Sequence, residues 1–129
     1  MPVADGEHLY QYAIIRGDLN MPPGKLSAQA GHCYGDSFAN AEKLDPATAT
    51  SYRDRTRGGS KVTLVAKNQT QLIKAFAKAR KIGLPCALIV DQHHIMPPHF
   101  NGQPIITGLG IGPCTKDQCR EITKKFRCL

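Results

Sequence analysis

The hydrophobic pattern of the chain changes several times between a period of two residues and a period of three to four. The period of two, together with short continuous apolar runs, predicts strands, and the longer period predicts amphipathic helices. Four segments have the strand pattern: 11–16, 61–67, 86–90 and 105–111. Three segments have the helix pattern, 25–42, 68–83 and 115–129, and a proline after Asp45 predicts a short extra helix before the second strand.

Capping residues support two of these helices. Asn68 with Gln71, and Thr115 with Gln118, have the spacing of helix N-terminal caps. Gly83 is suited to ending the helix that Asn68 begins. In the last helix we expect the apolar residues to pack inward and the cations to face solvent; these are Cys119, Ile122, Phe126 and Leu129 on one side and Lys124, Lys125 and Arg127 on the other.

The helix at 25–42 carries two distinctive sets of residues. Lys25, Gln29 and His32 are spaced i, i+4 and i+7, so they share one face. A second face consists of small residues that would let the helix lie close to a sheet: Ala28, Gly31, Gly35 and Ala39. A cation, an amide and an imidazole at the mouth of a strand–loop–helix unit indicate a reactive site, and a solvated polar face is the alternative interpretation.

The order of elements predicts the fold class. Strands alternating with helices are typical of an α/β protein, here a three-layer single domain with a four-stranded mixed, mostly parallel sheet and helices on both faces. No helix separates the last two strands, so we do not expect them to be simple parallel neighbours. We expect a flexible tail at 1–9 and the domain at 10–129.

The apolar strand at 86–90 ends on Asp91. Ligands gather outside the carboxyl ends of strands in open α/β sheets, so Asp91 is expected near Lys25 and His32. An aspartate that caps a loop is the alternative. Three histidines follow closely, His93, His94 and His99, but the prolines among them and the lack of a helical His pair argue against a metal site.

Composition and charge narrow the function. The 129 residues are 41% hydrophobic and 21% charged, which fits a globular domain, and the apolar runs are too short for a bilayer. The N-terminus lacks a signal-peptide pattern, so we expect a cytoplasmic protein. The five cysteines form no C-x-x-C pair, so neither disulfides nor zinc are expected, and Cys33 and Cys86 should be core residues.

The net charge of +7 favours a polyanionic partner, and nucleic acid is the first candidate. Cations that could contact RNA are concentrated in the connection before the second strand and near the first loop: Arg16, Arg53, Arg55, Arg57 and Lys61. A solvated loop is the alternative for the connection. We favour its arginines over the lysine stripe of the middle helix, because a loop can reach outward more freely; the stripe consists of Lys74, Lys78 and Lys81.

Four blocks of the sequence, in order, resemble the type-two peptidyl-tRNA hydrolases of archaea and eukaryotes. The first block is Asp18-Leu19-x-Met21-x-x-Gly24-Lys25-x-x-Ala28-Gln29-x-x-His32. The others are Lys61-Val62-Thr63-Leu64, Gly83-Leu84-Pro85-x-Ala87-Leu88-Ile89-x-Asp91, and Thr107-x-Leu109-Gly110-Ile111-Gly112-Pro113. The resemblance implies hydrolysis of the ester between peptide and tRNA, without metal or organic cofactor, and leaves a homodimer open.

The resemblance also implies site residues. The family's active-site pattern carries over to Lys25, Gln29, His32, Asp91 and Thr107. A second family threonine is replaced by Ile95, and the loop before Thr107 is about four residues longer than usual for the family. A non-catalytic tRNA- or partner-binding homologue is therefore the alternative function, and a metal-dependent activity at the three histidines ranks behind it.

Overall fold

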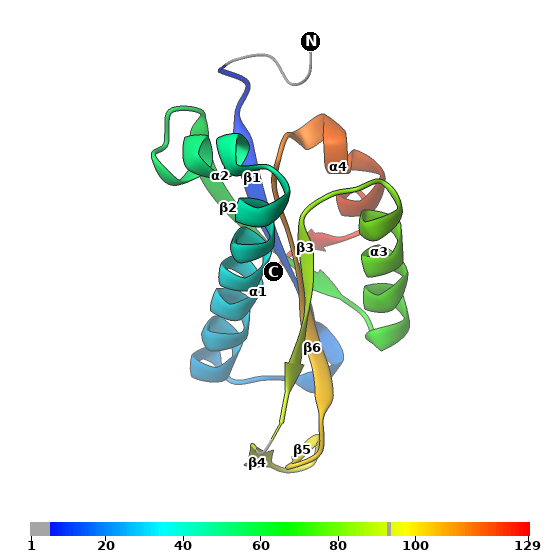
Figure 1. Ribbon diagram of the computed structural model, residues 1–129. Coiled ribbons are helices and arrows are strands. Elements are labelled where there is room, and N and C mark those ends of the chain that lie inside the picture. Colours follow the sequence, from blue (N-terminus) through cyan, green and yellow to red (C-terminus); the bar gives the residue numbers. More distant parts are fainter. Residues whose placement is uncertain (1–5, 93) are drawn as a thin grey trace.

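The computed structural model describes residues 6–92 and 94–129 (Figure 1). The expected tail at 1–9 falls largely on residues 1–5, which lie outside the described residues. Leu9 is fully buried and begins the first strand, two residues earlier than the sequence pattern predicts. The elements in chain order are β1 (Leu9–Arg16), η1 (Gly17–Leu19), α1 (Pro23–Leu44), α2 (Pro46–Arg53), β2 (Gly58–Ala66), α3 (Gln69–Lys81), β3 (Cys86–Asp91), β4 (Ile95–Met96), β5 (Phe100–Asn101), β6 (Ile105–Cys114), α4 (Lys116–Thr123) and β7 (Arg127–Cys128).

The main sheet has five strands in the order β3-β6-β1-β2-β7, so the expectation of a four-stranded, mostly parallel sheet is wrong. Only β1 and β2 form a parallel pair, and every other neighbouring pair is antiparallel. The physical reason is the connection between β3 and β6, which contains no crossover helix and returns the chain antiparallel. A separate two-stranded ribbon, β4–β5, lies within that connection.

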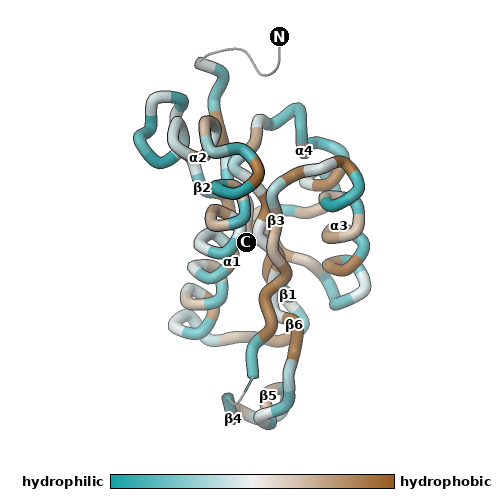
Figure 2. The backbone as a smooth tube through the Cα atoms, viewed as in Figure 1, coloured by the Kyte–Doolittle hydropathy of each residue, from teal (hydrophilic) through white to brown (hydrophobic). Residues whose placement is uncertain are grey.

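Two clusters of buried residues lie on the two sides of the sheet. One joins α3 and α4 to the strands through residues such as Leu72, Ile122 and Ile14. The other joins α1 and the β4–β5 ribbon through residues such as Cys33 and Phe100. Figure 1 shows α1 and α2 on one side of the sheet and α3 and α4 on the other, and Figure 2 shows the hydrophobic residues concentrated along the central strands.

The close approach of α1 to the sheet involves a different face from the one predicted. The small residues Ala28, Gly31, Gly35 and Ala39 are exposed, and the buried face runs through Gln29, Cys33, Ser37 and Ala41. A side chain at Gly110 of β6 would collide with the backbone carbonyl of Cys33. The glycine that permits close packing is therefore on the strand, because one small partner at each crossing point suffices.

The capping residues occur where the sequence predicts them, but the last helix is shorter than expected. Asn68 accepts a hydrogen bond from the backbone of Gln71, and Thr115 with Gln118 forms a complete capping box. Helix α4 ends at Thr123, since the following chain turns to pair with β2 as β7. Leu129 is consequently 60% exposed, which contradicts its predicted inward packing.

Candidate active site

An ion pair links the start of α1 to the end of β3. The Lys25 Nζ atom lies 3.0 Å from the Asp91 Oδ2 atom, and the two side chains are only 9% and 18% exposed. Pro22 is the N-cap of α1, so Lys25 sits in the first helical turn, where the free backbone N–H groups add positive potential. The sequence expectation that these two residues converge at the carboxyl end of a strand is confirmed.

A buried hydrogen bond lies one helical turn further along α1. The Thr107 hydroxyl donates to the Gln29 Oε1 atom at 2.5 Å, and both side chains are buried. Because Oε1 accepts this bond, the two N–H donors of the Gln29 amide remain for another partner.

A β-bulge aims Thr107 at α1. The register between β3 and β6 shifts between Ile89 and Val90: Ile89 pairs with Gly108 and Val90 pairs with Ile106. Thr107 is the extra residue, so it joins Gly108 on the α1 side of the sheet instead of pointing the other way. Strict alternation along the strand would have turned this hydroxyl away from Gln29.

His32 differs from the other two residues of its helical face. The Lys25 side chain is largely buried and Gln29 is buried, but His32 is exposed. Within the described part of the chain, no side-chain hydrogen bond of His32 occurs. Of the three residues on this predicted face, Lys25 and Gln29 therefore lie against the sheet, and His32 lies at the protein surface.

The long connection 92–104 brings a residue to the site that sequence reasoning missed. The Phe100 ring, 2% exposed, lies under the Lys25 ammonium, with 4.2 Å between the Nζ atom and the ring centroid. The only sequence signal is an isolated aromatic residue in a polar, proline-rich loop. Ile95, where the family carries a threonine, is 73% exposed.

The histidines of this connection do not assemble a metal site in the described residues. Among 6–92 and 94–129, no three His, Cys, Asp or Glu side chains come close enough to hold an ion. His93 lies outside the described residues. The His94 ring meets the Phe100 ring edge-on, with centroids 5.8 Å apart, which gives it a packing contact.

The guanidinium group of Arg16 makes hydrogen bonds within the protein. Its guanidinium donates to the Asp18 carboxylate at 2.8 and 3.2 Å and to the Ile106 carbonyl at 2.9 Å. The hydrogen bond and charge of Arg16 hold the pKa of Asp18 below its usual value. The arginine thus ties the loop after β1 to β6, immediately beside Thr107.

The basic connection before β2 lines a shallow cavity of about 290 Å³. The Lys61 ammonium lies over the rings of Tyr52 and Tyr34, at 5.1 and 5.8 Å from their centroids. Arg53 and Arg55 contribute to the same cavity. Arg53 is partly neutralised, because its Nε atom lies 3.2 Å from the carboxylate of Asp54.

Arg57 faces inward instead. Its Nε donates to the backbone carbonyl of Glu7 at 3.0 Å, and one of its terminal nitrogens is buried. It therefore differs from Arg55, which is exposed and lies in a left-handed backbone conformation with φ of 61°.

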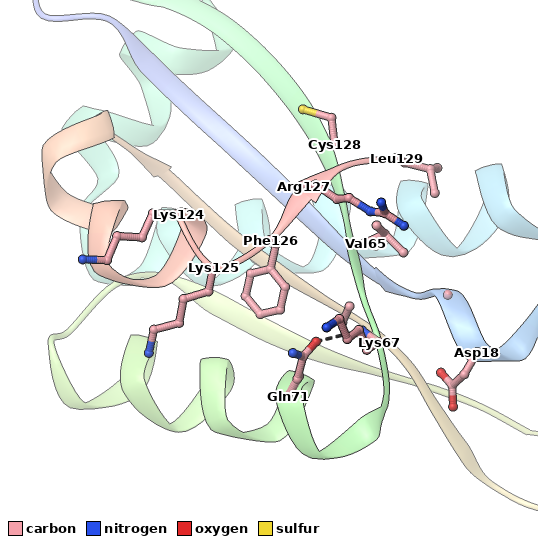
Figure 3. Close-up of a pocket in the computed structure, with 12 residues that line it drawn as sticks. Asp18, Val65, Lys67, Gln71, Lys124, Lys125, Phe126, Arg127, Cys128 and Leu129 are labelled. Atoms are coloured by element: carbon pink, nitrogen blue, oxygen red, sulfur yellow. Dashed lines mark hydrogen bonds between the residues drawn. The ribbon is translucent and has the colours of Figure 1, made fainter.

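A larger groove, about 940 Å³, lies elsewhere (Figure 3). The chain after α4 forms one wall, and the end of β2 with the start of α3 forms the other. Its cations are Lys67, Lys124, Lys125 and Arg127, and the Phe126 ring lies between its walls. None of the five residues expected at the active site lines it, so its size does not make it the catalytic cleft.

The family model described as "Peptidyl-tRNA hydrolase PTH2" matches residues 9–129. Proteins named "Peptidyl-tRNA hydrolase" from Methanococcus vannielii and Methanocaldococcus jannaschii are 33% and 32% identical over 124 and 116 residues. These alignments cover 94% and 90% of this chain, and 100% and 96% of the relatives.

A eukaryotic relative extends the comparison. The protein from Dictyostelium discoideum named "Probable peptidyl-tRNA hydrolase 2" is 28% identical over 117 residues, which span 91% of this chain and 53% of that protein. In the described residues, no helix combines the length and apolarity that crossing a bilayer requires. With a family match over nearly its whole length and archaeal relatives above 30% identity, the chain belongs to the PTH2 family of peptidyl-tRNA hydrolases.

Proposed function

We infer that this protein hydrolyses the ester bond between the peptide and the terminal ribose of peptidyl-tRNA, acting with translation in the cytoplasm. The family match over residues 9–129 and the names of the relatives support this function. The observation that supports particular catalytic residues is the Lys25–Asp91 ion pair, which lies one helical turn from the Gln29–Thr107 hydrogen bond. Ile95 is exposed and does not intrude on these two pairs, so it gives no support to a non-catalytic role.

The reaction requires an activated water and stabilisation of a tetrahedral oxyanion. The water oxygen bonds to the ester carbonyl carbon, and a base accepts one water proton. The carbon–oxygen bond to the ribose then breaks, and the ribose oxygen leaves as a hydroxyl after receiving a proton. No metal or organic cofactor is needed for these steps.

We assign stabilisation of the oxyanion to Lys25 and Gln29. The Lys25 ammonium has three N–H donors, of which Asp91 uses one, and the Gln29 amide retains its own two. Donors held in a largely buried site need little reorganisation as charge develops, which is the main source of such stabilisation. Thr107 is fully buried and donates to Gln29, so we assign it the positioning of that amide.

Asp91 and His32 are the two candidates for the group that orients or deprotonates water. The Asp91 Oδ2 atom is held by Lys25, which leaves Oδ1 to accept a hydrogen bond from water. His32 is exposed on the next turn of α1. Asp91→Asn and His32→Gln variants separate the roles, since the base is the residue whose loss abolishes the rise of kcat with pH.

The test of the function is release of free tRNA from a purified peptidyl-tRNA. Lys25→Ala and Asp91→Ala should each lower kcat by a factor on the order of 100 or more. Arg120→Ala is the matched control, because that cation is also ion-paired but its side chain is 66% exposed and lines neither basic cavity. If the unmodified protein releases no more tRNA than buffer does, the proposed function is wrong.

We propose that the tRNA backbone runs over the cavity lined by Lys61, Arg53 and Arg55, and that Arg57, which donates to the Glu7 carbonyl, stays outside this path. Cations beside two tyrosine rings suit phosphates and neighbouring bases or sugars. Tyr34 lies nine residues after Lys25 on α1, roughly 14 Å along the helix, a span that a tRNA acceptor end bridges easily. Arg16 lies beside the site, but its guanidinium is engaged by Asp18 and acts on RNA only indirectly.

The basic groove beside β7 is the rival path, and the two can be separated. An Arg53→Ala, Arg55→Ala, Lys61→Ala variant should weaken binding of different tRNAs alike and reduce the slope of affinity against salt. Its kcat at saturating substrate should change little. The matched variant changes three cations of the groove, Lys67, Lys125 and Arg127. Loss of affinity in the groove variant alone would contradict the proposed path.

A further inference from the structure

The buried ring of Phe100 packs against the ammonium group of Lys25. The Lys25 Nζ atom lies 4.2 Å from the centroid of the Phe100 ring, within the range of a cation–π interaction. We propose that Phe100 is a positioning residue that orients the Lys25 ammonium for hydrolysis. This inference rests on the proposed function, and it concerns a residue that lies outside the four sequence blocks that resemble the family, in the connection between β3 and β6.

The ring and Asp91 together define the direction of the ammonium. An ammonium group has three N–H donors. One points to the Asp91 Oδ2 atom at 3.0 Å, and the ring face attracts the positive charge from a second side. The remaining donor is left for the substrate oxygen, so two fixed partners determine where the third bond is made.

The β4–β5 ribbon keeps the ring in place. Met96 pairs with Phe100 across the ribbon, and the backbone N–H of Gly102 donates to the His94 carbonyl at 2.9 Å. Phe100 belongs to the same buried cluster as Leu19 and Met21 from the loop before α1. The ring is thus buried within the cluster that joins this loop to the ribbon, on the side of the sheet where Lys25 lies.

Such support matters because lysine is a flexible side chain. A free lysine loses considerable rotamer entropy when it is fixed, and a site that fixes it beforehand avoids this loss during reaction. The cation–π attraction is also strengthened by desolvation, and the Lys25 side chain is only 9% exposed. Weakening the ring's attraction should therefore lower kcat and leave KM within about twofold.

Stepwise fluorination of the ring tests this without changing its shape greatly. Fluorine withdraws electron density and weakens the attraction of the ring face for a cation. Site-specific replacement of Phe100 by 4-fluoro-, 3,5-difluoro- and 3,4,5-trifluorophenylalanine should lower kcat in steps, to about a tenth in the last variant. Phe100→Leu, which keeps an apolar side chain but removes the ring, should lower kcat at least as much.

Phe76 provides the matched control. Its ring also faces a cation, with 5.7 Å between the Arg80 guanidinium carbon and the ring centroid, but it lies in the cluster on the other side of the sheet. The same fluorinated series there should leave kcat unchanged. A kcat that is flat across the Phe100 series, in proteins with unaltered thermal unfolding, overturns the proposal, because a ring that merely fills space would give that result.

A spectroscopic readout keeps the inference separate from the proposed function. A proton above an aromatic ring is shifted upfield, so the Lys25 ε-methylene protons should resonate upfield in the unmodified protein and return in Phe100→Leu. Absence of this difference overturns the proposal even if the protein is active. If the unmodified protein releases no tRNA, the proposed function fails, and an upfield shift would still support the contact between the lysine and the ring.

Discussion

Replacing Thr107 by valine isolates the role of one buried hydroxyl. Valine has nearly the same shape, so the change removes the hydrogen bond to Gln29 and leaves the packing of β6 intact. The Gln29 Oε1 atom then loses its partner in a buried setting, which costs about 1–3 kcal/mol. For a domain of this size we expect the midpoint of thermal unfolding to fall by about 3–6 °C per kcal/mol lost.

The effect on catalysis follows from the same bond. A Gln29 amide without its anchor can rotate, and its N–H donors then no longer point reliably at the oxyanion. Removal of a single oxyanion donor lowers kcat by about 100- to 1,000-fold in other hydrolases, so partial loss of orientation should lower it by roughly 10- to 100-fold. Single-turnover cleavage of peptidyl-tRNA at saturating enzyme measures this step directly.

A double-mutant cycle shows whether Thr107 positions the Gln29 amide or contacts the substrate directly. If Thr107 acts only through Gln29, adding Thr107→Val to a Gln29→Ala protein should change kcat by less than about twofold. If the two substitutions instead reduce kcat multiplicatively, Thr107 contacts the substrate itself and the reasoning above is refuted. Thr123→Val, which removes a hydroxyl on α4 that donates within its own helix, is the control for the substitution itself.

Three further predictions concern the scaffold. Gly110→Ala should destabilise the protein by at least about 2 kcal/mol in urea unfolding, because the new methyl group meets the Cys33 carbonyl. Gly31→Ala, in open space on the exposed face of α1, should stabilise the protein by about 0.5–1 kcal/mol; the same change in stability from both substitutions would contradict the packing described. In the native protein only Cys128 should react rapidly with a thiol reagent at neutral pH, since the other four cysteines are buried and the reagent cannot reach them; rapid labelling of a second thiol would disagree. Asp18→Asn should lower stability at pH 7. The difference from the unmodified protein should be full above the ordinary aspartate pKa and should shrink as pH falls through the lower pKa of folded Asp18; a difference that does not shrink in acid would exclude the ion pair as its cause.

Local chemistry determined much of what the sequence predicts correctly. The apolar run through Ile14 identifies β1, and the side chains of Asn68 and Thr115 identify two helix starts, since a cap depends on residues only three positions away. The convergence of Lys25 and Asp91 was also predictable, because the carboxyl ends of β1 and β3 lie at one end of the sheet.

Only the tertiary structure decided the features that depend on residues far apart in the chain. Two faces of α1 had small residues, and the surface of β6, with Gly110 opposite Cys33, selected which of them is buried. β7 forms because the edge of β2 is free to pair, a fact that no pattern in residues 127–128 expresses. The bulge that turns Thr107 toward Gln29 and the ribbon that carries Phe100 beneath Lys25 arise the same way, because register and loop closure depend on the whole sheet.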